Sequence, residues 1–247
     1  MVLLLVVDLD PDLAALRPLG AFFALRTVGE TPGTARPALP TLAQVYENRA
    51  SDVYGNSMTF RVEKVARALR APEPRIAASI AHQGLAARLW SVALGCAVLY
   101  GRIPDLSPRR LHWDPDASAP DDLWLDAVEP LPGDAETIAD VVLHGHLEPL
   151  TAALRAEYRL ATGLLWGNAA SALAGAARQL GHRPDVSARV RDLSAALLAH
   201  PLLEGTLEST TGRRRSCCLY YRLPEGGVCG DCCFTRAPRS SPRGTSG

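Results

Sequence analysis

The chain has 247 residues, of which 47% are hydrophobic and 21% charged, a composition typical of a soluble globular protein with one large domain or two small ones. Its 26 basic and 26 acidic residues cancel, so bulk electrostatics gives no reason to expect a nucleic-acid partner. No segment resembles a signal peptide, and the apolar stretch 89–101 is too short to span a bilayer. We therefore expect a cytoplasmic protein, in which thiols stay reduced.

The first half of the chain is predicted to mix strands, loops and helices. Residues 2–7 form an apolar run typical of a buried strand, and the glycines and prolines of 28–41 predict a loop. From about 41 to 101 the apolar spacing is helical, with turn signals at 71–74 and a buried core helix over 89–101. Two strand-like runs around a turn rich in Asp and Pro predict a β-hairpin, over 111–113 and 123–125.

The second half is predicted to be helical from 132 to 201. Asp134 is a suitable N-cap, since its carboxylate can accept hydrogen bonds from first-turn amides. Gly145 and Pro149 are expected to interrupt this helix, with Pro149 in the first turn of the next one. Apolar residues then recur at helical spacing in two further runs, over 165–180 and 186–197.

Together these elements predict an α+β fold that is predominantly helical, with a helical body, a small β-hairpin and a C-terminal segment rich in cysteine. We divide the chain into an N-terminal α+β part, 1–131, and a C-terminal helical part, 132–235. The latter contains the segment 213–233, which we call the cysteine segment. The tail, 236–247, has no apolar periodicity and is predicted to be disordered.

Five of the six cysteines lie in the cysteine segment: Cys217, Cys218, Cys229, Cys232 and Cys233. A disulfide framework would spread cysteines along the chain, whereas a local group of thiols is typical of one metal or iron–sulfur centre. A bridge between the adjacent Cys217 and Cys218 would be strained, because neighbouring Cα atoms lie ~3.8 Å apart and disulfides usually need at least ~4.4 Å. The sixth, Cys96, is predicted to be a small buried core residue.

Zinc and a binuclear iron–sulfur cluster are alternative occupants of this group. Cys229 and Cys232 form a C-x-x-C knuckle that could wrap a zinc ion, but Cys217 and Cys218 have no spacer between them. Two irons relax that demand, because they offer ligand positions in different directions, and we therefore favour iron–sulfur over zinc. If both adjacent cysteines bind, residues 216–219 must leave regular strand geometry.

The stretch 214–224, RRSCCLYYRLP, followed by the C-G-D-C of 229–232, resembles the C-terminal signature C-C-x10-C-x2-C of the ferric siderophore reductase (FhuF-like) family. A weaker similarity is the L-W-G-N of 165–168, and the resemblance covers roughly 145–233. It implies that a 2Fe–2S cluster is bound by four cysteines: Cys217, Cys218, Cys229 and Cys232. Cys233 departs from the signature. It could replace Cys232 as a ligand, but we interpret it as a bystander thiol because Cys232 keeps the spacing.

The neighbours of the cysteines suit such a cluster. Four arginines would offset its negative charge, favour its reduction and attract an anionic chelate or an acidic donor: Arg213, Arg214, Arg215 and Arg222. A solubilising basic loop is the alternative. Three glycines are expected to let backbone amides approach the cluster sulfurs: Gly226, Gly227 and Gly230. Trp166 and Asn168 are interpreted as packing residues that support the cluster end.

Other candidate residues are weaker. His144 and His146 are two apart and would not share a helical face, which leaves a metal or substrate role a minor alternative. His82 and His112 are interpreted as structural or surface residues. Ten acidic residues and no Lys or Arg lie between Leu111 and Leu154, and we expect them to form a solvated surface rather than a docking face.

The resemblance implies an oxidoreductase that reduces ferric iron in an imported siderophore by one electron and so releases Fe(II) in the cytoplasm. The implied partners are a ferric siderophore and a siderophore importer at the inner membrane, to which the protein could be peripheral. Without a G-x-G-x-x-G or phosphate-binding loop, electrons must come from an external donor. The alternatives are a 2Fe–2S electron carrier or sensor and a zinc-stabilised binding module.

Overall fold

A computed structural model of the chain describes residues 9, 13–27, 39–51 and 53–238. The strand predicted at 2–7 and most of the loop predicted at 28–41 lie outside the described residues, as does the tail from 239 onward. The division of the chain after residue 131 stays a prediction.

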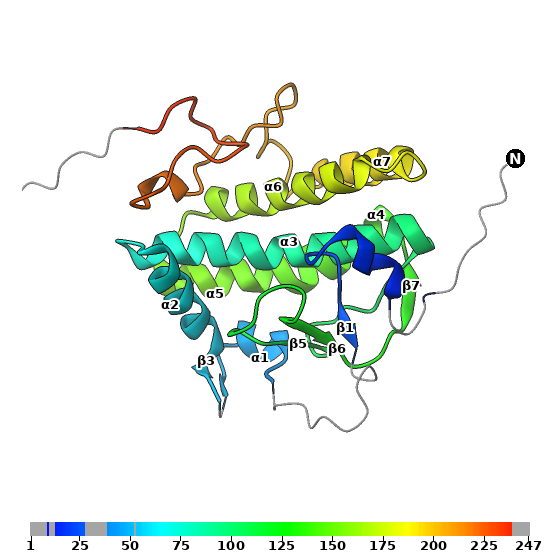
Figure 1. The fold of residues 1–247 in the computed structure, drawn as a ribbon, viewed down its shortest axis with the longest axis horizontal. Helices are drawn as coiled ribbons and strands as arrows, with labels where there is room; N and C mark the ends of the chain where they lie inside the picture. The colour runs from blue at the N-terminus through cyan, green and yellow to red at the C-terminus, as the bar shows by residue number, and fades with distance from the viewer. Residues whose placement is uncertain (1–8, 10–12, 28–38, 52, 239–247) are drawn as a thin grey trace, which may run out of the picture.

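Helices dominate the described part and confirm the predicted α+β, mainly helical class. They are α1 (Leu42–Tyr46), α2 (Ser57–Leu69), α3 (Pro74–Tyr100), α4 (Ala135–Ala139), α5 (Glu148–Tyr158), α6 (Thr162–Gly181) and α7 (Ser187–Leu198). Short 3-10 helices are η1 (Ala14–Leu19) and η3 (Tyr220–Arg222), and η2 (Asp140–Leu147) is a π-helix. The long α3 runs through the middle and packs against α2, α5, α6 and α7 (Figure 1).

The central position of α3 explains its composition. The helix starts with Pro74 in its first turn and ends at Gly101, whose φ of 76° closes the last turn in the left-handed conformation that glycine adopts easily. Its second half is buried on nearly every side, including Cys96 at 0% exposure, which confirms the predicted core helix and the buried cysteine. A helix covered on all sides needs apolar residues around its full circumference.

The predicted hairpin is present. The strands β5 (Leu111–Trp113) and β6 (Leu123–Leu125) pair antiparallel, and β1 (Arg26–Thr27) adds parallel to β6. Two further pairs join β2 (Ala50–Ser51) to β3 (Gly55–Asn56), and β4 (Arg102–Pro104) to β7 (Pro130–Pro132). The β2–β3 pair lies within the stretch predicted as helical, and its two-residue strands are too short for a periodic signal.

The helix after Asp134 begins as predicted, because the Asp134 carboxylate accepts a hydrogen bond from the Thr137 amide at 2.8 Å. The predicted interruption at Gly145 is wrong, since α4 continues through the π-helix η2 into α5 without a break. Pro149 has no N–H to donate to the carbonyl four residues earlier, and a wider turn accommodates this loss. Pro149 lies in the first turn of α5, as predicted.

The two histidines of η2 point in different directions. His146 is buried, with Nδ1 2.8 Å from the Tyr46 hydroxyl and Nε2 2.6 Å from the Leu106 carbonyl. His144 is exposed and pairs with the Glu148 carboxylate. His146 therefore ties the helix to α1 and to the loop after β4, which is a structural role.

Burial also affects the titration of histidines. It holds the pKa of His82, on α3, at about 3, with Arg214 contributing, and that of His146 at about 4. An unfolded histidine titrates near 6.5. The stability that these neutral rings provide is therefore complete above about pH 6.5 and is lost as pH falls below it, because only the unfolded chain takes up the protons.

We accordingly expect the free energy of unfolding to fall by about 2 kcal/mol per buried histidine between pH 7 and pH 5. Urea unfolding at both pH values should show a smaller loss in His146→Gln than in the wild type. The exposed His182→Gln is the matched control and should behave like the wild type. Equal losses in all three proteins would contradict the assignment.

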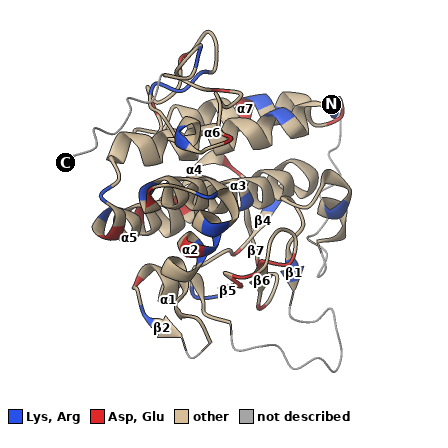
Figure 2. Cartoon of the chain, turned by 60° about the vertical axis from the view of Figure 1, so that its left-hand side comes forward, with Lys and Arg blue, Asp and Glu red and all other residues tan. Residues whose placement is uncertain are grey.

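The acidic stretch forms a solvated surface, as expected, with Asp122 as its one buried acidic residue. Most of its carboxylates accept hydrogen bonds or form ion pairs with residues from elsewhere in the chain, and acidic and basic segments lie next to one another around the small strands (Figure 2). The pairs are Asp114 with Tyr54, Asp116 with Lys64, Asp121 with Arg26, Asp122 with Arg88, Asp126 with His112 and Glu129 with Arg110. Apart from His112, these partners lie outside the acidic stretch, so charge counts along it could not reveal the contacts.

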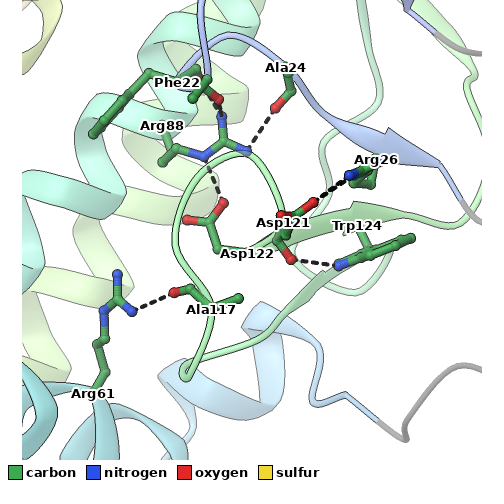
Figure 3. A network of polar contacts seen from close by, with 10 residues as sticks. Phe22, Ala24, Arg26, Arg61, Arg88, Ala117, Asp121, Asp122 and Trp124 are labelled. Carbon is green, nitrogen blue, oxygen red and sulfur yellow. Dashed lines mark hydrogen bonds and ion pairs between the residues drawn. The ribbon is translucent and has the colours of Figure 1, made fainter.

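One of these pairs is buried. Arg88 Nε donates to Asp122 Oδ1 at 2.9 Å, with side-chain exposures of 2% and 5% (Figure 3). The same guanidinium donates to the carbonyl oxygens of Ala21 at 3.1 Å, of Ala24 at 2.8 Å and of Phe22. Arg88 thus holds the segment after η1 against α3.

Candidate iron–sulfur site

The cysteine segment lies over the helical body, next to α6 and one end of α3 (Figure 1). Its backbone is irregular apart from η3 and an isolated bridge between Leu207 and Arg214. Leu219, directly after the two adjacent cysteines, has a φ of 70°. Residues 216–219 have therefore left strand geometry, as expected if both adjacent thiols serve one centre.

The structure brings the thiols of this segment together. Cys218 and Cys229 have their Sγ atoms 3.6 Å apart, and Cys217 lies beside Cys232 and Cys233. All of these cysteines are free thiols, with Cys218 and Cys232 buried and the others half-buried. Within the described residues, no three or more His, Cys, Asp or Glu side chains converge closely enough to hold a metal ion. The thiols lie instead in two looser groups, Cys218 with Cys229 and Cys217 with Cys232 and Cys233.

Two backbone amides point at cysteine sulfurs. The Leu219 amide donates to Cys217 Sγ at 3.3 Å, and the Phe234 amide donates to Cys232 Sγ at 3.4 Å. Such hydrogen bonds stabilise thiolate ligands and tune the potential of an iron–sulfur cluster. The role predicted for glycine amides is wrong for Gly226, whose amide donates to the Leu223 carbonyl oxygen at 3.0 Å, and it stays a prediction for Gly227 and Gly230. A Cβ on Gly226 would lie 2.2 Å from the Tyr220 carbonyl oxygen, and Cβ atoms on the other two glycines, 227 and 230, would meet nothing within 4 Å.

Crowding makes these thiols hard to ionise on their own. Burial raises the pKa of Cys217, and the neighbouring Cys218 and Cys232 raise it further. Burial and the Cys218 thiol raise the pKa of Cys229, and burial with Cys217 raises that of Cys233 to about 11. A bound cation reverses this preference, because thiolates are the ligands and metal binding releases their protons. A bound metal would therefore supply the positive charge that these thiols need in order to ionise.

A buried network centred on Arg214 connects the thiols to the helical body. Arg214 Nε donates to Asp231 Oδ2 at 2.9 Å, and Nη1 donates to Asn168 Oδ1 on α6. The Asn168 side-chain amide donates to the Ser79 carbonyl on α3 at 2.9 Å, and Ser79 Oγ donates to the Cys218 carbonyl at 2.9 Å. The network thus connects α3 and α6 to Cys218 and to Asp231 in the knuckle, and it confirms the supporting role predicted for Asn168.

Two buried donors in this region remain available. Arg214 Nη2 and Ser216 Oγ have no hydrogen-bond partner among the described residues. Gly167 allows α6 to approach here, because a Cβ on it would lie 2.2 Å from Ser216 Oγ. Thiols, amide donors to sulfur and unused buried donors beside them together fit an anionic iron–sulfur cluster.

The remaining arginines have individual roles. Arg213 donates to the carbonyl oxygens of Cys232 at 2.8 Å and Phe234 at 2.7 Å, and Arg222 pairs with Glu73 before α3 at 3.0 Å. Arg215 is exposed. The alternative of a solubilising basic loop is therefore wrong for Arg213 and Arg214, which hold the cysteine segment in place.

Sequence reasoning missed the roles of Ser79 and Asp231. Ser79 is a small polar residue within an apolar helix, and no sequence pattern set it apart. Asp231 had a usable signal, because an acidic residue inside the C-x-x-C knuckle, close to a run of arginines, suggests an ion pair. Trp166, two residues before Asn168 on α6, is buried and packs in the core, as predicted.

The fold and the thiol site define an iron–sulfur protein in which a C-terminal redox centre is docked on a helical body. Residues 82–223 match the family model described as "Ferric iron reductase FhuF-like transporter", and residues 214–234 match the model "FhuF 2Fe-2S C-terminal domain". The chain belongs to the FhuF-like ferric iron reductase family, and its C-terminal segment is a 2Fe–2S domain. The second match favours the predicted cluster over zinc.

The family description is that of an oxidoreductase acting on ferric iron. No curated protein matches the sequence. Throughout the described ranges, none of the helices combines the length and apolar character needed to cross a bilayer.

Proposed function

We propose that the protein passes one electron from a 2Fe–2S cluster to a ferric siderophore and so releases Fe(II) in the cytoplasm. Siderophores hold Fe(III) through hard oxygen donors, and they hold Fe(II) far more weakly. One electron therefore suffices to free the metal, and the reaction needs no acid, base or nucleophile. The bound cluster supplies that electron.

The observation that carries the proposal is the group of thiols with amide donors to two of its sulfurs. We propose Cys217, Cys218, Cys229 and Cys232 as the cluster ligands. Leu219 and Phe234 would stabilise the sulfurs through their amides, and Arg214 would place positive charge beside them. Both the charge and the hydrogen bonds favour uptake of an electron by the cluster.

The 3.6 Å between Cys218 Sγ and Cys229 Sγ supports a division of these ligands. Two thiolates on one tetrahedral metal, each bound at ~2.3 Å, have sulfur atoms ~3.8 Å apart. We propose that Cys218 and Cys229 bind one iron, and that Cys217 and Cys232 bind the other.

Serine variants examined by Mössbauer spectroscopy test this division. A serine alkoxide is a harder ligand than a thiolate and favours Fe(III), so the added electron should go to the other iron. Reduced Cys218→Ser and Cys229→Ser should therefore give the same spectrum, which should differ from that of Cys217→Ser. A match between Cys218→Ser and Cys217→Ser would show that the division is wrong.

The donor and the place of reaction are also proposals. The donor would be a separate redox protein, because the sequence has no nicotinamide or flavin motif. The reaction would take place in the cytoplasm or at the cytoplasmic face of the inner membrane, where an importer delivers the ferric siderophore.

The decisive experiment starts with anaerobic purification, visible absorption, and iron and sulfide analysis. The reduced protein is then mixed with several ferric siderophores and a chelator that traps Fe(II). We expect the cluster to be oxidised and one Fe(II) to be trapped per cluster. A reduced cluster that stays reduced with every chelate would favour the electron carrier or sensor.

A further inference from the structure

A cavity of about 500 Å³ lies beside the cysteine segment. Its lining comes from α3, from α6, from residues 19–23 and from the knuckle residues 229–231. This volume is in the range of sites that bind small molecules. The cavity therefore places a surface that could hold a small molecule next to Cys229, one of the proposed cluster ligands.

Small side chains create the cavity. Ala87 and Ser91 line it from α3, and Ala172 and Gly175 line it from α6, so neither helix fills the space between them. Polar groups are few and lie among these small residues: Gln83, Ser171, Arg178 and Gln179. A largely apolar lining with a few hydrogen-bonding groups is typical of binding sites for organic ligands.

The wall opposite the helices is held in a fixed position. Arg88 donates to the carbonyl oxygens of Ala21 and Phe22, and its charge is balanced by the buried Asp122. On the knuckle side, Asp231 is fixed by its ion pair with Arg214. The cavity is therefore formed before any ligand arrives, which lowers the entropic cost of binding.

We propose that this cavity binds the ferric chelate while it is reduced. The inference rests on the proposed function and adds the place of the substrate. A chelate in the cavity would touch the half-buried Cys229, so one electron would pass from the reduced cluster through this ligand to Fe(III), which becomes Fe(II). The apolar lining, with Phe22 at its rim, suits the organic exterior of a chelate. Arg178 makes no ion pair within the described residues, and it suits a carbonyl or anionic oxygen.

Gly175→Leu tests the proposal by filling the cavity. A Cβ at Gly175 meets only the Arg178 guanidinium, at 3.8 Å, so the backbone can accept a side chain there. Leucine also favours a helix more than glycine does, which protects the fold. The matched control is Gly163→Leu, in the first turn of the same helix, where an added Cβ meets nothing within 4 Å.

Binding is measured by calorimetry with the cluster-loaded protein and gallium(III) complexes of a trishydroxamate and of a tricatecholate chelator, which bind without accepting an electron. We expect Gly175→Leu to weaken binding at least about tenfold through steric exclusion, and Gly163→Leu to change it by no more than about twofold. The visible spectrum and the reduction potential of the cluster should be unchanged in both variants.

The two proposals fail in different ways. If wild-type protein binds neither gallium complex and its reduced cluster is not oxidised by the ferric ones, the proposed function is wrong. If the wild type binds and reduces a chelate and Gly175→Leu does so equally well, the function stands and the cavity is not the substrate site.

Discussion

Replacing Cys232 by alanine is expected to abolish the 2Fe–2S cluster, whereas the same replacement of the adjacent Cys233 is expected to leave it in place. Cys232 is buried at 4% exposure, and its sulfur accepts the Phe234 amide at 3.4 Å. Its turn in the knuckle is closed by its own amide, which donates to the Cys229 carbonyl at 3.1 Å. Cys232 is thus held at the site by the backbone.

The loss of bound iron and sulfide should be large, because a missing thiolate removes part of a metal-binding free energy on the order of 10 kcal/mol. We expect the iron and sulfide bound to anaerobically purified Cys232→Ala to fall at least about tenfold. Cys233→Ala should retain both, together with the visible absorption of the wild type.

Cys233 could rescue the variant, because its thiol also lies beside Cys217. The double variant, Cys232→Ala with Cys233→Ala, resolves this. If Cys232→Ala keeps its cluster and the double variant loses it, Cys233 is a substitute ligand. Loss of the cluster in Cys233→Ala alone would show that it is not a bystander.

Replacing Asp122 by alanine is expected to cost about 3–5 kcal/mol of folding stability, because it leaves the Arg88 guanidinium buried without its counter-ion. Both side chains of this pair are almost fully buried. The carbonyl oxygens of Ala21, Phe22 and Ala24 would remain, but they carry no net charge to balance the arginine (Figure 3).

Asp121→Ala provides the matched control. Asp121 is the next residue along the chain and also accepts from an arginine, with Arg26 Nε at 3.0 Å, but the side chains of this pair are 40% and 55% exposed. Exposed pairs contribute about 0–1 kcal/mol. Urea unfolding of the two variants should therefore differ by several kcal/mol. Equal losses would show that burial of the Arg88 pair does not matter.

The sequence predicted those features that depend on neighbouring residues. The long apolar run of α3, the Asp134 cap and the alternation of β5 and β6 are local patterns, and each has a direct physical cause in helix or strand periodicity. The cysteine spacing is local too, and it led to the correct cofactor. These predictions did not depend on how distant segments meet.

The predictions that failed depended on distant partners. Arg214 looks like one of a row of solvated arginines, yet it is buried because Asp231 and Asn168 accept its hydrogen bonds. The burial of Asp122 within the acidic stretch likewise depends on a distant partner, Arg88. The cavity could not be predicted either, since it arises where Ala87 on α3 faces Gly175 on α6, and small residues in a helix are equally common in tight packing.

The Arg214 network also has a consequence for how the protein matures. Cys218 contacts Ser79 across 139 positions of the chain, and Arg214 contacts Asn168 across 46. During synthesis α3 and α6 are completed before the cysteines are, and folding tends to proceed from the N-terminal side. The helices that receive the redox centre can thus begin to assemble before the cysteine segment is complete, so iron and sulfide would be delivered to a helical body that is already forming.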